Sequence, residues 1–118
     1  MLLVRHAGHG DGWGVLGGAV EPGESPTAAV REAREEIGVD VQLVRLLDVL
    51  GGPDYEVSYP GGDRVAYVTA VYEARVAGGS PVVSDGQLSE LAWFGTRDLP
   101  GLGLSRFARA LFGATGRL

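Results

Sequence analysis

The chain has 118 residues, a formal net charge of −5, two histidines and no cysteine. Without cysteine it has no disulfides, thiolate nucleophile or Cys-type zinc site, so a bound metal would need oxygen ligands, which favours Mg²⁺ or Mn²⁺. The acidic balance argues against a nucleic-acid polymer as partner, and no segment has the about 20 apolar residues of a membrane span. We therefore expect one cytoplasmic domain, residues 1–118, with no membrane contact.

The apolar pattern predicts a strand at residues 1–5, and the glycines that follow predict a loop up to residue 14. Ser25 and Pro26 are typical of a helix start, and Gly38 is typical of a helix end, so we expect a helix at 26–37. Further strands are predicted at 39–50, 55–59, 64–76 and 88–94.

The second half of the chain also contains turn signals. Residues 60–63 predict a hairpin turn, and residues 98–101 predict a second turn. Apolar side chains at helical spacing predict a closing helix at 105–112. Strands and helices that do not alternate regularly are typical of an α+β fold.

The predicted helix at 26–37 places its side chains in distinct sectors. At about 100° per residue, Glu32, Glu35 and Glu36 share an acidic sector that borders an apolar stripe of Ala29, Ala33 and Ile37. A solvated charged face is one interpretation. However, Glu32 and Glu36 are a like-charge pair that costs a helix about 0.2–0.5 kcal/mol. A hard divalent cation would remove that repulsion, so a metal site is the second interpretation.

Residues 18–39 combine these carboxylates with glycines and arginines at characteristic spacings. The stretch resembles the Nudix box, whose signature is G-x5-E-x7-R-E-U-x-E-E-x-G-U, where U is a bulky apolar residue. The matching positions are Gly18, Glu24, Arg31, Glu32, Glu35, Glu36, Gly38 and Val39. Nearly the whole chain resembles a small Nudix hydrolase, which implies an α/β/α sandwich around a mixed β-sheet.

Two features depart from the family pattern. Six residues, not seven, separate Glu24 from Arg31, a pair that in the family braces the loop against the helix. The register from Arg31 onward is unchanged, so we expect the acidic sector to be kept. The strand that usually precedes the segment at 1–5 is also missing: it lies upstream, or another element or subunit replaces it. We expect a homodimer or a rearranged sheet, because open strand edges are avoided.

The resemblance implies Mg²⁺-dependent hydrolysis of a nucleoside diphosphate linked to another group, with Mn²⁺ as a possible substitute. The implied metal ligands are Glu32, Glu35, Glu36 and the backbone carbonyl of Gly17 or Gly18, and Glu35 and Glu36 are also the implied catalytic residues. Structural roles in the motif are implied for Gly18, Glu24, Arg31 and Gly38. An alternative is a catalytically weakened binding or sensor module for nucleotide-like ligands.

Other candidate residues lie outside the box. The resemblance implies a loop carboxylate as general base, for which Asp85 and then Glu90 are the candidates; their alternatives are a turn residue and a strand-edge charge. Arg5, His6 and Tyr67 are candidate substrate contacts, with surface, loop or packing roles as the alternatives.

Two aromatic residues near the end of the last predicted strand have competing interpretations. Trp93 and Phe94 could stack on a base, but we expect both in the core.

Overall fold

The computed structural model describes residues 1–6, 12–17, 20–25, 27–83, 86 and 88–118. Its elements are β1 (Leu2–His6), α1 (Ala29–Ile37), β2 (Asp40–Leu50), η1 (Pro53–Tyr55), β3 (Glu56–Ser58), β4 (Arg64–Ala66), β5 (Thr69–Gly78), β6 (Leu88–Trp93), η2 (Thr96–Gly101) and α2 (Arg106–Ala114). The predicted α+β class is confirmed. Each described α-helix has nine residues, too short to cross a bilayer.

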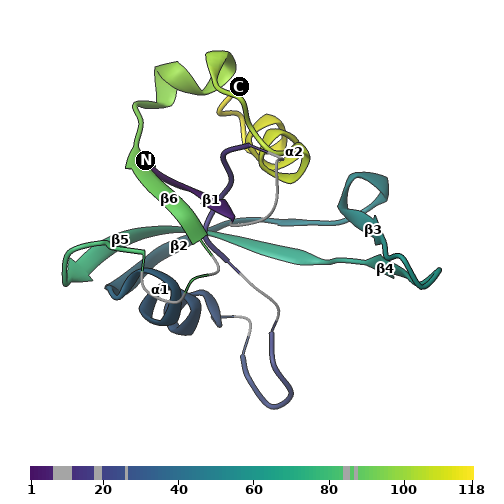
Figure 1. Ribbon diagram of the computed structural model, residues 1–118, viewed down its shortest axis with the longest axis horizontal. Coiled ribbons are helices and arrows are strands. Elements are labelled where there is room, and N and C mark those ends of the chain that lie inside the picture. The colour runs from purple at the N-terminus through teal and green to yellow at the C-terminus, as the bar shows by residue number, and fades with distance from the viewer. Residues whose placement is uncertain (7–11, 18–19, 26, 84–85, 87) are drawn as a thin grey trace.

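The described strands pair as three antiparallel two-stranded ladders, β1–β6, β2–β5 and β3–β4. On the β1–β6 ladder Val4 is opposite Leu91, and two backbone bonds of 2.8 and 2.9 Å join Val4 to Gly14. Gly14 therefore takes up hydrogen-bonding groups of β1 that a further strand would use. Figure 1 shows α1 and α2 on opposite sides of the long β2–β5 ladder, as in an α/β/α arrangement.

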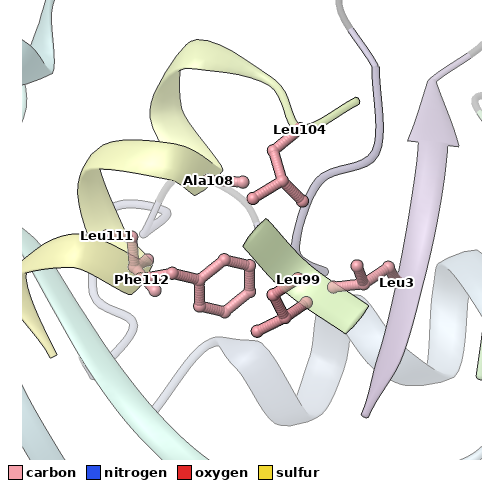
Figure 2. Close-up of a cluster of buried hydrophobic side chains, with 6 residues drawn as sticks. All are labelled: Leu3, Leu99, Leu104, Ala108, Leu111 and Phe112. Carbon is pink, nitrogen blue, oxygen red and sulfur yellow. The ribbon is translucent and has the colours of Figure 1, made fainter. Parts of the chain in front are cut away.

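Two hydrophobic clusters form the core, and β1 contributes to both. The α2 cluster consists of Leu3, Leu99, Leu104, Ala108, Leu111 and Phe112, and Figure 2 shows the Phe112 ring directed toward Leu99. The α1 cluster consists of Val4, Ala33, Ile37, Val39 and Leu88. Adjacent strand residues point to opposite faces, so the fully buried neighbours Leu3 and Val4 enter different clusters.

Helix α1 begins at Ala29, three residues after the start predicted near residue 26, which itself lies outside the described residues. The Ser25 carbonyl accepts a hydrogen bond from the Ala28 N–H at 3.2 Å, and its hydroxyl accepts one from Thr27 at 3.3 Å. Ser25 thus closes a turn before the helix instead of capping it. The helix ends at Gly38, whose φ of 69° lies in the left-handed region that glycine adopts without strain.

The single strand predicted at 64–76 is two strands, β4 and β5. They are separated at Tyr67 and Val68, and the Tyr67 N–H donates to the Tyr55 carbonyl at 3.0 Å. Because β4 pairs with β3 and β5 pairs with β2, the chain changes partner at this point. Alternation of side chains is compatible with either partner, so the pattern alone did not reveal the break.

The C-terminal region follows the prediction more closely. The predicted turn at 98–101 is part of η2, a 3₁₀ helix, and the predicted helix at 105–112 is α2. The Ser105 hydroxyl caps α2 by accepting a hydrogen bond from the Ala108 N–H at 3.1 Å. Ala108, Leu111 and Phe112 then face the core, at the spacing expected for one side of a helix.

Replacing Leu99 with alanine tests the α2 cluster. Leu99 is fully buried, so Leu99→Ala should lower the free energy of unfolding by about 2–5 kcal/mol through lost burial and a new cavity. Urea denaturation would measure the loss. Leu118→Ala is the matched control, because Leu118 is exposed at the chain end. Equal losses in the two variants would contradict the assigned core.

Candidate functional site

The carboxylates of α1 lie at the border between solvent and the α1 cluster. Glu36 is 4 % exposed and follows Ala33 by three residues on the side of the helix that packs into the core. The Glu32 side chain is 12 % exposed, whereas that of Glu35 is 55 % exposed. Burying a carboxylate is costly without compensating interactions, so this degree of burial marks the acidic sector as more than a solvated face.

Arg31 contacts four carboxylates of α1 and of the turn before it. Its Nε lies 2.6 Å from Glu24 Oε2, its Nη2 3.0 Å from Glu32 Oε1, and its Nη1 2.9 Å from Glu35 Oε2. Glu21 Oε1 is also 3.5 Å from Nη1. Four carboxylates therefore share one guanidinium, and the group has three formal negative charges in excess.

The shortened spacing between Glu24 and Arg31 does not separate the pair. Arg31 donates to both Glu24 oxygens, from Nε at 2.6 Å and from Nη2 at 3.0 Å. Glu24 Oε1 also accepts a hydrogen bond from the Glu21 N–H at 3.0 Å, which ties the turn at 21–24 to the helix. These hydrogen bonds lower the pKa of Glu24 to about 2, and the contact with Glu24 raises the pKa of Arg31.

The chemistry of this group suits a hard divalent cation, because its side chains offer carboxylate oxygens and excess negative charge. Among the described residues, however, no three acidic or histidine side chains are placed to hold one ion together. Glu32 and Glu35 contact Arg31 instead, so binding an ion between them would require both to turn away from the guanidinium. Gly18, the expected source of a carbonyl ligand, lies outside the described residues.

A second group of candidate residues lies at the end of β1. Arg5 is opposite Glu90 on β6, and Arg5 Nη1 lies 3.8 Å from Glu90 Oε1. The Arg5 guanidinium also stacks on the Trp13 ring, 4.6 Å from its centroid. Trp13 was not singled out from the sequence, where an aromatic residue in a loop gave no signal of its partner. Asp85, the other candidate base, lies outside the described residues.

Tyr67 forms a pair with Tyr59, and their hydroxyl oxygens are 2.6 Å apart. This hydrogen bond raises the pKa of Tyr59. Tyr67 and His6 both line a large cleft of about 1760 Å³, whose wall includes strands β2 and β5 and both α-helices. Pockets that enclose a small ligand have volumes of about 300–1,000 Å³. The volume of this cleft is larger, as is typical of an open groove.

The cleft does not include the charged side chains around Arg31 or the Arg5–Glu90 pair. Ala33 and Ile37 contribute to its wall, but the described lining contains neither the three α1 carboxylates nor Arg5 and Glu90. Of the candidate substrate contacts, the described lining includes His6 and Tyr67.

Trp93 corrects one expectation for the core. It is 61 % exposed and lines the cleft, while Phe94 packs against the α2 cluster. The two neighbours point to opposite faces of an extended chain, so only one can enter the core at this position.

The lowered pKa of Glu24 predicts a pH dependence of stability. A folded pKa of about 2, against an ordinary value of 4.5, means that the unfolded chain binds this proton more readily. The stabilisation from Glu24 is therefore complete above pH 4.5 and is lost as the pH falls toward 2. Urea denaturation at pH 7 should show Glu24→Gln as less stable than the wild type, with a smaller difference near pH 3.

The matched control is Glu73→Gln, which removes the same charge from an exposed pair with Arg45. Its effect on unfolding should be small and should vary little across this pH range. A Glu24→Gln deficit that stays constant from pH 7 to pH 3 would contradict the ion-pair assignment.

Comparison with known proteins gives the chain a family. A model of the Nudix domain matches residues 1–112. The NAD-capped RNA hydrolase NudC of Deinococcus radiodurans is 39 % identical over 88 residues, which are 74 % of this chain and 28 % of that protein. Diphosphoinositol polyphosphate phosphohydrolase 2 of Mus musculus is 47 % identical over 55 residues, which are 46 % of this chain and 31 % of that protein. The chain thus spans less than a third of either relative.

A solved structure agrees with the family match along the whole chain. The crystal structure of a MutT Nudix hydrolase from Burkholderia pseudomallei has a TM-score of 0.74 and 28 % sequence identity, and the match covers 99 % of this chain and 86 % of that one. The acidic helix with its bracing Glu24–Arg31 pair occupies the part of the sequence that resembles the Nudix box. Family model and fold agree, and the chain belongs to the Nudix hydrolase family.

Proposed function

We propose that this chain is a cytoplasmic enzyme that hydrolyses the diphosphate bond of a nucleoside diphosphate linked to another group, in an Mg²⁺-dependent reaction. The observation that carries the proposal is the group of four carboxylates around Arg31. Its negative charge would repel a polyanionic substrate, so the substrate needs divalent cations in order to approach. Mn²⁺ is the expected substitute, since it also prefers oxygen ligands.

In this proposal Glu32, Glu35 and Glu36, with the carbonyl of Gly18, would hold the cation. When bound, it would supply compensation of phosphate charge and activation of water. Arg31 and Glu24 fix the start of α1 by their two hydrogen bonds, so the helix presents its acidic side in a constant orientation.

The proton of the attacking water needs an acceptor, and the proposed general bases are Asp85 and Glu90. Glu90 is opposite Arg5 on the β1–β6 ladder, and Arg5 Nη1 lies 3.8 Å from Glu90 Oε1. The proposed substrate contacts are Arg5 and His6 at the end of β1 and Tyr67 in the cleft.

The nature of the linked group is a separate question. By name, the two relatives act on NAD-capped RNA and on diphosphoinositol polyphosphate, which are different substrates. The test is a panel of ADP-ribose, sugar nucleotides, dinucleoside polyphosphates, prenyl diphosphates, oxidised nucleoside triphosphates and NAD-capped RNA, with products separated by chromatography. The acidic net charge leads us to expect small molecules to be better substrates than the RNA.

Replacing Glu36 tests the site. Glu36→Gln should lower kcat by about 100-fold or more, because a neutral amide is a poorer ligand for a hard cation. Chelation by EDTA should abolish turnover, and added Mg²⁺ or Mn²⁺ should restore it.

Glu73→Gln, on the surface of β5, is the control that should keep full activity. Equal activity of Glu36→Gln and the wild type would contradict the assigned site. Binding of a panel member in calorimetry without product would instead support the alternative of a nucleotide-binding or sensor module.

We also infer that the chain forms a homodimer, with exposed apolar side chains of β2 and β6 as the contact surface. Support comes from Leu46, Val49 and Trp93, which line the cleft and are each more than half exposed. Sedimentation velocity should show a dimer that dissociates on dilution, and Trp93→Asp should shift the equilibrium toward monomer. A wild-type protein that sediments as a monomer at all concentrations would contradict this inference.

A further inference from the structure

Arg5 is the last residue of β1 before an irregularity in the β1–β6 ladder. Val4, just before it, is fully buried, while the Arg5 side chain is 44 % exposed. The register of the β1–β6 ladder shifts between Arg5 and His6. Regular pairing of β1 with β6 therefore ends at Arg5.

Trp13, the residue under that guanidinium, is fixed from several sides. Its backbone N–H donates to the Gly103 carbonyl at 2.8 Å, and its backbone carbonyl accepts from the Ser105 N–H at 2.8 Å. Its ring meets Phe94 edge-on, with centroids 5.0 Å apart and an interplanar angle of 71°. The next residue, Gly14, pairs with Val4 of β1. The indole is therefore a rigid surface tied to both β1 and the start of α2.

Among the described residues, few groups contact the in-plane N–H groups of the Arg5 guanidinium. The cation–π contact uses the face of the guanidinium, whereas hydrogen bonds to oxyanions lie in its plane. The distance to Glu90 is 3.8 Å, beyond hydrogen-bond length. Arg5 Nε is buried and makes no hydrogen bond within the described part of the chain.

We propose that Trp13 is a positioning residue, which holds the Arg5 guanidinium flat so that its in-plane N–H groups bind the diphosphate oxygens of the substrate. This inference rests on the proposed function. Planar, bidentate recognition of phosphate is the chemistry for which arginine is suited and lysine is not. Glu90 faces Arg5 while no substrate is bound, and the substrate oxyanion takes over that contact.

Arg5 follows Val4 on the opposite face of β1. Val4 packs with Ala33 and Ile37 of α1, whereas the Trp13 ring under the Arg5 guanidinium packs against the α2 cluster. The Arg5 side chain is 44 % exposed at the end of β1, so a diphosphate can reach it from solvent.

The kinetic test replaces Trp13 in the full chain. Trp13→Leu should raise KM for a diphosphate substrate by about 3- to 30-fold and change kcat by less than about 3-fold, since the stack acts on binding. Trp13→Phe keeps an aromatic face and should recover most of the loss. Phe107→Leu is the matched control: it removes a similar edge-on contact, with Tyr55, and should leave KM unchanged.

A binding test avoids the need for turnover. The chain has two tryptophans, so Trp93→Phe leaves Trp13 as the single indole emitter. Inorganic pyrophosphate added to this variant should change the Trp13 emission as the guanidinium engages the anion. Arg5→Lys in the same background should weaken pyrophosphate binding by about tenfold or more, because an ammonium neither stacks as well nor binds bidentately.

The outcomes separate this proposal from the proposed function. Activity on the panel, with Trp13→Leu matching the wild type in KM, would overturn the positioning role and leave the hydrolase intact. No activity on the panel, with a pyrophosphate response that Arg5→Lys weakens, would overturn the hydrolase and support the Arg5 site. If Trp13→Leu does not fold, unchanged pyrophosphate affinity in Arg5→Lys would still overturn the proposal.

Discussion

The structure depends on one short strand that is buried on both of its faces. Leu3 of β1 packs against α2 and η2, and Val4 packs against α1 and β6. Strand residues alternate between faces, so a five-residue strand joins two separate clusters without any long connection. The same strand then sets where Arg5 and His6 emerge. The alternation of side chains along β1 therefore determines both the packing of the core and the position of these candidate residues.

The charged groups divide into two centres of opposite character. Around Arg31, four carboxylates share one guanidinium, which leaves an excess of negative charge beside the α1 cluster. Around Arg5, a guanidinium is held by an indole and faces a single, more distant carboxylate. Both centres are attached to elements that meet at Val4, Ala33 and Ile37, so their separation is fixed by close packing and not by flexible loops.

Local chemistry explains which sequence-based expectations succeeded. Gly38 ends α1 because a left-handed residue is needed there, and Ser105 caps α2 through its hydroxyl. Each depends on neighbours within four residues in the chain. The two errors have different causes. Ser25 makes local hydrogen bonds with Thr27 and Ala28 that close a turn instead of capping the helix. The strand expected at 64–76 changes partner at Tyr67, and that change depends on which distant segment offers hydrogen bonds.

By itself, the sequence determined the α+β class, the family resemblance and the acidic sector of one helix. Those features depend on the spacing between residues that are close together in the chain. It did not determine that Arg31 would gather Glu21, Glu32 and Glu35 together with Glu24. Nor did it show that Trp13 would lie under Arg5 or that Trp93 would face solvent. Those facts depend on contacts between segments far apart in the chain, whose geometry is set only when β1 is packed between the two clusters.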